Sequence, residues 1–106
     1  MKQEVYKYNL SYDRNGGWLG DIILTKEGLF FSNTDVGDFT YDFYFGSVVS
    51  SNNDVRTFFL EMDKDYFLNK IIKNLSDFSA SECKEYVNNI LPALKEAIKK
   101  ELEDEA

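Results

Sequence analysis

The hydrophobic residues follow two different periods along this chain. Over residues 4–46 they alternate with polar residues, which is typical of half-buried strands, and over residues 55–103 they recur every three or four positions, which is typical of helices. Clusters of turn residues interrupt the alternating part at 14–17, 26–28 and 33–37. The pattern predicts four antiparallel strands joined by short turns, which is a β-meander.

The fourth of these strands has the clearest alternation. The expected strands span residues 4–12, 18–25, 28–33 and 38–45. In the fourth, the aromatic positions are predicted to point inwards: Phe39, Tyr41, Phe43 and Phe45. The intervening positions are predicted to point outwards: Asp38, Thr40, Asp42 and Tyr44. One face of the sheet is therefore expected to be aromatic and the other to carry carboxylates.

Residues 55–62 fit either a short helix or an edge strand. Val55, Phe58 and Met62 have helical spacing, and Asp54 or the residue before it can cap such a helix. The aromatic pair in the middle of this stretch would also suit a strand. We favour the helix, because the spacing and the cap agree.

Two further helices follow. Asp63 can cap the first, which carries one apolar stripe, and the sequence from Ser79 to Glu82 is a capping box that opens the second. Pro92 lies inside the second helix and lacks an amide hydrogen, so the helix is expected to kink or restart there. The acidic residues 101–105 are expected to form a frayed, solvated end.

The size and composition fit one folded domain. The chain has 106 residues, of which 43% are hydrophobic and 16% aromatic, too many for a disordered acidic protein. We therefore expect a single α+β domain over residues 1–106, with a four-stranded antiparallel meander at about 4–46. Two or three helices at about 55–103 would pack on its aromatic face.

The charge balance limits the partners. There are 19 acidic and 12 basic residues, a formal net charge of −7, which disfavours direct binding to nucleic acid or to an anionic membrane. A basic protein surface is the natural partner of such a chain. The alternative is that the charge only keeps a small domain soluble. The oligomeric state does not follow from the sequence.

The sequence offers little for catalysis. Histidine is absent, and no phosphate-binding loop or cluster of metal ligands is present. Asp38 and Asp42 are a carboxylate pair, but on an outward face neither would be desolvated enough for acid–base work. We expect no enzymatic activity, no catalytic residues, no cofactor and no metal.

The lone Cys83 cannot form an internal disulfide and has a helical, apolar setting, which indicates a reducing compartment. The first residues lack the apolar stretch of a signal peptide, and no apolar run is long enough to span a membrane. A cytoplasmic location is therefore expected.

The candidate binding site is the group of acidic and tyrosine side chains around the fourth strand. Its members are Asp35, Asp38, Asp42, Tyr44 and Asp54, to which Asp21 on a neighbouring strand can add. Asp38 and Asp42 would lie about 13 Å apart, and fixed carboxylates at such spacing can imitate a row of phosphates. The alternative is that these charges only solvate the sheet and protect its edge from aggregation.

Two stretches resemble small acidic proteins encoded by phages and other mobile elements. They are Asp35-x-Gly37-Asp38-Phe39-x-Tyr41-x-Phe43 and Phe59-Leu60-x-x-Asp63-x-Asp65-Tyr66-Phe67-x-x-Lys70-Ile71. The resemblance covers residues 35–72 and brings no catalytic or ligand residues with it. It implies a bacterial host, and such proteins include inhibitors of host defence nucleases, anti-CRISPR proteins among them.

These observations lead to one preferred function and two alternatives. The preferred function is a non-enzymatic inhibitor that covers a basic groove of a host nucleic-acid-binding defence protein, with a CRISPR nuclease as the favoured target. The alternatives are a structural or regulatory interaction module of a phage or mobile element, and an immunity protein that neutralises a toxin.

Overall fold

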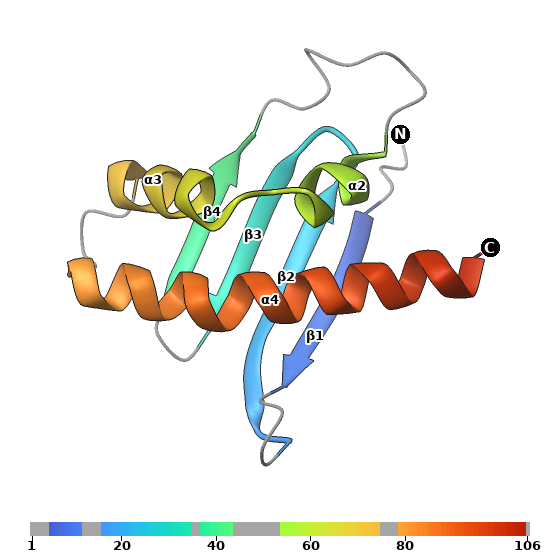
Figure 1. The fold of residues 1–106 in the computed structure, drawn as a ribbon, viewed down its shortest axis with the longest axis horizontal. Coiled ribbons are helices and arrows are strands. Elements are labelled where there is room, and N and C mark those ends of the chain that lie inside the picture. The colour runs from blue at the N-terminus through green and yellow to red at the C-terminus, as the bar shows by residue number, and fades with distance from the viewer. Residues whose placement is uncertain (1–4, 12–15, 35–36, 44–53, 75–78, 106) are drawn as a thin grey trace.

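The chain folds as a four-stranded antiparallel sheet followed by helices, an α+β fold (Figure 1). The computed structural model describes residues 5–11, 16–34, 37–43, 54–74 and 79–105. The strands are β1 Val5–Ser11, β2 Trp18–Thr25, β3 Leu29–Thr34 and β4 Asp38–Asp42. The described helices are α2 Val55–Leu60, α3 Lys64–Asn74 and α4 Ala80–Glu105. The strand order β1-β2-β3-β4 confirms the predicted meander.

Glycines with positive φ make two of the turns. Gly28 (φ 101°) closes the β2–β3 turn, where its amide donates to the carbonyl of Thr25 at 3.1 Å. Gly37 (φ 146°) precedes β4, and its main chain exchanges hydrogen bonds of 3.1 and 3.2 Å with Thr34. A side chain would strain the backbone at either position, which explains why turn chemistry predicted the strand boundaries well.

The ambiguous stretch after β4 is a helix. The carboxylate of Asp54 accepts from the amide of Arg56 at 2.8 Å, which caps α2. The predicted fourth strand reached residue 45, whereas β4 ends at Asp42; positions 44 and 45 lie outside the described residues.

Both predicted caps of the later helices are present. Asp63 Oδ1 accepts from the amide of Asp65 at 2.7 Å at the start of α3. At the start of α4, the Glu82 amide donates to Ser79 Oγ at 3.2 Å, and the Ser79 amide donates to Glu82 Oε1 at 3.0 Å. This reciprocal pair is a capping box, as the sequence indicated.

Pro92 does not divide α4. Of the two predicted outcomes, a kink or a restart, the restart does not occur: one helix runs from Ala80 to Glu105 through this residue. Pro92 is on the exposed side, while its neighbours Leu91 and Leu94 are buried against the rest of the protein. A proline inside a helix costs roughly 3 kcal/mol. Burial of the apolar stripe on both sides of it stabilises the continuous helix more than the missing hydrogen bond destabilises it.

All three described helices lie on one side of the sheet, with α4 crossing the strands (Figure 1). The core between the layers is centred on the fully buried ring of Phe30, which contacts four other phenylalanines, and Phe43 is only half-buried at the edge of this cluster. The contacts of Phe30 are with Phe39, Phe43, Phe59 and Phe67, at 5.5–6.1 Å between ring centroids. The aromatic residues predicted to point inwards that are described, Phe39, Tyr41 and Phe43, do pack against this core.

A buried polar contact between described residues joins the two layers. The hydroxyl of Tyr86 on α4 forms a short hydrogen bond with the hydroxyl of Ser32 on β3, and both residues are buried. Burial raises the pKa of Tyr86 far above its ordinary value. The pair links α4 to β3 inside the core, where breaking a hydrogen bond between buried groups is costly.

Candidate functional site

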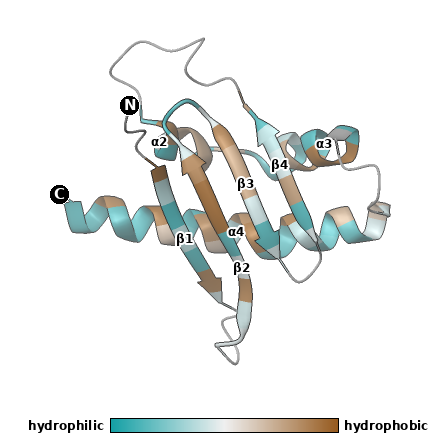
Figure 2. Cartoon of the chain, turned by 180° about the vertical axis from the view of Figure 1, so that it is seen from behind, coloured by the Kyte–Doolittle hydropathy of each residue, from teal (hydrophilic) through white to brown (hydrophobic). Residues whose placement is uncertain are grey.

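No helix of the described ranges covers the other face of the sheet (Figure 2). We call this surface the open sheet face. Alternation along the strands assigns to it Val5, Lys7, Asn9, Ser11, Trp18, Asp21, Ile23, Leu29, Phe31, Asn33, Asp38, Thr40 and Asp42.

The strand register gathers acidic and amide side chains in one row across the open sheet face. Asn9 pairs with Asp21, Asp21 with Asn33, and Asn33 with Asp38. Within the row, Asn9 Nδ2 donates to Asp21 Oδ1 at 2.6 Å. Because neighbouring strands lie about 4.8 Å apart, the two aspartates are about 10 Å apart. The row presents two carboxylates, with one amide side chain between them and one beside Asp21, and each amide can both donate and accept.

Apolar side chains accompany this row. The next row places Ile23 and Phe31 side by side, and Phe31 is 39% exposed. Trp18 on β2 is 40% exposed and Val5 on β1 is 41% exposed. The burial pattern of β2 places Leu19 in the core, and Trp18 therefore faces outwards. Exposed aromatics beside charges are typical of protein-binding surfaces.

Three of the five predicted site residues are described. Asp38 is exposed at the start of β4, and Asp42 lies on the same face at the end of that strand. Asp54 is at the start of α2, on the helical side of the sheet. Asp35 and Tyr44 lie outside the described residues. The structure thus brings Asp38 and Asp42 together with Asp21, but not with Asp54.

Asp54 is bound within the protein by Arg56, whose side chain is only 7% exposed. Arg56 Nη2 lies 2.7 Å from Asp54 Oδ2, and its Nη1 lies 2.6 Å from Glu101 Oε1. Arg56 also pairs with Glu105 near the end of α4. We call these four residues the Arg56 cluster. The prediction that residues 101–105 are frayed was wrong, because they belong to α4 and the cluster holds Glu101 and Glu105. Residues 103–105 are exposed, as predicted.

The Arg56 cluster is attached to the sheet by two tyrosines of β1. The Arg56 guanidinium lies 4.5 Å from the ring centroid of Tyr6, a cation–π contact. The Tyr8 hydroxyl donates to Glu101 Oε1 at 2.9 Å, and burial raises the pKa of Tyr8 well above its ordinary value. Sequence reasoning missed this cluster. The available signal was an arginine among the apolar residues of α2, since a buried arginine requires acidic partners.

Hydrogen bonds from Arg56 lower the pKa values of Asp54 and Glu105 and raise that of Arg56. These shifts keep Asp54, Arg56 and Glu105 charged at neutral pH, and the single positive charge of Arg56 is shared among three acidic partners. Both carboxylate oxygens of Asp54 accept hydrogen bonds from the Arg56 side chain, so this carboxylate is less available to a partner. We assign the Arg56 cluster to stability and not to the binding surface.

Other titratable groups give no alternative centre in the described part of the chain. Cys83 is buried, and burial raises the pKa of its thiol, so the reactive thiolate is scarce at neutral pH. The described residues contain no group of three or more side chains placed to hold a metal ion.

In the part of the chain that the structure describes, no helix is long and apolar enough to cross a membrane.

Comparison with models of protein families identifies the family of this chain. A family model described as "Phage family" matches residues 1–82, which include the whole sheet, α2 and α3. The chain belongs to this phage family. This supports the resemblance to phage proteins seen in the sequence. No curated protein and no solved structure gave a match.

Proposed function

We propose that this phage-family protein inhibits a nucleic-acid-binding defence protein of the bacterial host by binding it, without catalysing a reaction. The target that we favour is a CRISPR nuclease. The observation that carries the proposal is the open sheet face, which presents an acidic row beside exposed aromatic residues and which no described helix covers.

The acidic row supplies the recognition. Asp21 and Asp38 face the same way from two strands of a rigid sheet, so little entropy is lost in fixing their positions on binding. The net charge of −7 would attract the protein to a basic groove from a distance. A groove that normally holds a phosphate backbone would accept this row in its place.

The neighbouring apolar residues would supply affinity. Trp18 and Phe31 are large, exposed and held by backbone pairing within the sheet. Aromatic side chains are enriched at the centres of protein interfaces, and charges alone add more to rate and specificity than to affinity. This combination supports a docking surface over a sheet whose charges serve only solvation, because Trp18 and Phe31 expose large apolar side chains beside the charges.

The test is capture of partners from host lysate on the tagged full chain, compared with Asp21→Lys/Asp38→Lys. We expect the wild type to retain a nucleic-acid-binding protein and DNA to compete with that capture. The double variant should lose the partner, because it replaces attraction with repulsion. Both side chains are exposed, so circular dichroism should show an unchanged fold.

The matched control is Glu85→Lys/Glu103→Lys, which makes the same change in charge at exposed positions of α4 on the helical side. It should bind as the wild type does. Equal capture by both double variants would overturn the proposal. Capture of a phage protein or a toxin in place of a nucleic-acid-binding protein would favour the interaction-module or immunity alternative.

A further inference from the structure

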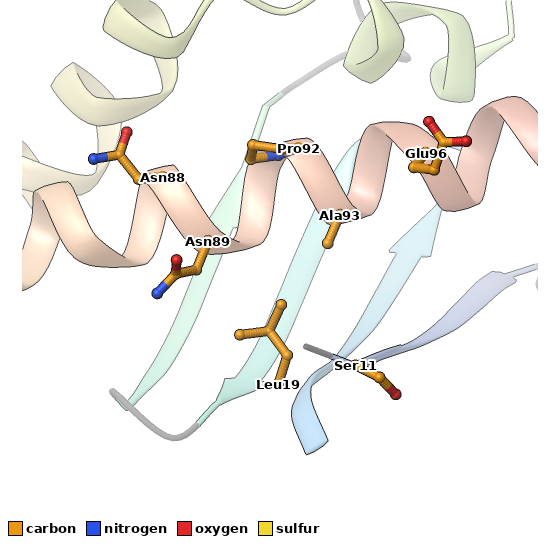
Figure 3. A pocket seen from close by; sticks show the side chains of 7 residues that line it. All are labelled: Ser11, Leu19, Asn88, Asn89, Pro92, Ala93 and Glu96. Carbon is orange, nitrogen blue, oxygen red and sulfur yellow. The ribbon is translucent and has the colours of Figure 1, made fainter. Parts of the chain in front are cut away.

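A pocket of about 580 Å³ lies beside the middle of α4 and the adjoining ends of β1 and β2. Asn89 and Ala93 lie on the side of α4 next to Leu19, whereas Pro92 and Glu96 lie on the other side of the helix (Figure 3). The polar side chains that line the pocket therefore do not converge on one ligand. We assign no ligand to it.

The outer edge of β4 has a better-defined chemistry. β4 is the last strand in the order β1-β2-β3-β4, and among the described strands it pairs with β3 alone. Figure 1 and Figure 2 show, from opposite sides, that α3 and the beginning of α4 extend past this edge. A strand added beside β4 would therefore be covered by α3 on the helical side.

The hydrogen bonds at the two ends of β4 show which main-chain groups point away from β3. Before β4, Gly37 exchanges main-chain bonds of 3.1 and 3.2 Å with Thr34. After it, the Phe43 amide donates to the Gly28 carbonyl at 3.0 Å. Antiparallel strands exchange such bonds through every second residue, so the amide and carbonyl of Thr40 point away from β3. This edge presents a donor and an acceptor to which an extended chain can pair.

The side chains of β4 on the open sheet face make the edge acidic. Asp38 and Asp42 flank Thr40 on this face. A strand beside β4 would place one residue opposite each aspartate, where lysine or arginine would be attracted and a carboxylate repelled. A second copy of β4 is a poor occupant for this reason. Antiparallel pairing centred on Thr40 would set Asp38 of one copy opposite Asp42 of the other.

The side chains beside the edge on the helical side are aromatic. Lys70 Nζ on α3 lies 5.8 Å from the ring centroid of Tyr41 and 5.2 Å from that of Tyr66, which places both rings near the same part of α3. Tyr41 is half-buried and Tyr66 is 42% exposed. Apolar side chains of an added strand would pack against these rings.

We infer that the outer edge of β4 is a docking site for an extended segment of a protein partner, which adds to the sheet as a further strand. The segment alternates basic residues, opposite Asp38 and Asp42, with apolar residues that face α3. Main-chain bonds to Thr40 supply affinity, and the alternating side chains supply specificity. The inference does not rest on the proposed function. Asp38 belongs to both surfaces, but the main-chain groups of the edge are not part of the open sheet face.

The test is an NMR titration of the full ¹⁵N-labelled chain with the peptide acetyl-Ser-Lys-Val-Thr-Val-Lys-Ser-amide. When its threonine pairs with Thr40, its two lysines lie opposite Asp38 and Asp42. We expect saturable shifts centred on the amides of β4 and slower hydrogen exchange at the Thr40 amide. Replacing both lysines by glutamate should weaken binding by at least about tenfold, because two attractive cross-strand pairs become repulsive.

Two N-methylated forms of the peptide are matched to each other. A methyl group on the threonine amide removes the donor to the Thr40 carbonyl and blocks the approach to β4, so binding should be lost. A methyl group on the amide of the following valine points away from β4 and should leave binding unchanged.

Equal binding of the two methylated forms, or of the lysine and glutamate peptides, would overturn the inference. So would the absence of saturable shifts, in which case the aspartates only protect the edge. Shifts centred on Asp21 and Phe31 would place the peptide on the open sheet face and would also overturn it. That last result would leave the proposed function standing, since capture from lysate tests the latter separately.

Discussion

Arg56 Nη1 and Glu101 Oε1 lie 2.6 Å apart although 45 residues separate them in the sequence. This contact joins the short helix α2 to the last turns of α4. The cation–π contact of the same guanidinium with Tyr6 extends the link to β1. One arginine thus connects three elements that the sequence places far apart.

We expect Arg56→Ala to lower the free energy of unfolding by about 2 kcal/mol. The buried guanidinium is lost and its acidic partners stay close together, but two of these are about one-third exposed, so water screens part of the effect. Urea unfolding measures the change. The control Lys84→Ala, at an exposed position of α4, should change stability by less than about 0.5 kcal/mol. Equal effects of both variants would show that the Arg56 cluster adds no stability.

The same cluster predicts a loss of stability in acid. Arg56 holds the pKa values of Asp54 and Glu105 below their ordinary values in the folded state. The stability they contribute is therefore present above their unfolded pKa values, near 4, and is lost as the pH falls through the lower folded values. Melting temperatures measured between about pH 6 and pH 2 should fall more steeply for the wild type than for Arg56→Met. If melting temperature fell equally with pH in both proteins, Arg56 would not be the cause of the lowered pKa values of Asp54 and Glu105.

Phe30 and Phe31 are neighbours on β3 with opposite roles. Phe30→Ala should cost about 3–5 kcal/mol, because its fully buried ring contacts four other phenylalanines. Phe31→Ala, on the open sheet face, should cost less than about 1 kcal/mol. Urea unfolding of the two variants makes the comparison. Similar losses in the free energy of unfolding would contradict the assignment of Phe30 and Phe31 to opposite faces of β3, which the strand register determines.

Adding a side chain at Gly20 tests how closely β2 and β3 pack at this position. A Cβ at this position would lie 2.7 Å from Thr34 Cγ2 and 3.1 Å from the carbonyl oxygen of Asn33. Gly20→Ala should therefore destabilise the protein by about 1–3 kcal/mol. Adding Thr34→Ser removes the methyl group that causes the shortest contact and keeps the hydroxyl that donates to Gly37. Thermal melts should show partial recovery in the double variant, and no recovery at all would place the strain elsewhere.

Salt dependence tests the acidic row once a partner has been captured. Affinity of the wild type should fall steeply as NaCl rises from about 0.1 to 0.5 M, because exposed charges are screened beyond about one Debye length. The single variants Asp38→Asn and Asp42→Asn should each reduce this dependence, since each removes one charge of the open sheet face. Binding that is indifferent to salt would exclude recognition through these carboxylates.

The sequence by itself determined the elements and the two faces of the sheet. Alternation around Phe39 and Asp38 identified what faces inwards and outwards, because side chains on a strand alternate regardless of what packs on them. The capping box at Ser79 and the turn glycines set boundaries through bonds between residues at most a few positions apart. Such patterns arise from interactions between residues that are close in the sequence, so they can be recognised from the sequence alone.

The tertiary structure decided what depends on distant partners. Asn9, Asp21, Asn33 and Asp38 share one row only because three strand registers agree, and a shift by one residue in any of them would break the row. Pro92 stays within α4 because packing of the buried stripe outweighs a local penalty. The acidic end of α4 is helical and Asp54 is held by an ion pair because both meet Arg56 in three dimensions. Charge in the sequence gave the sign of the potential, and only folding decided which carboxylates are available to a partner.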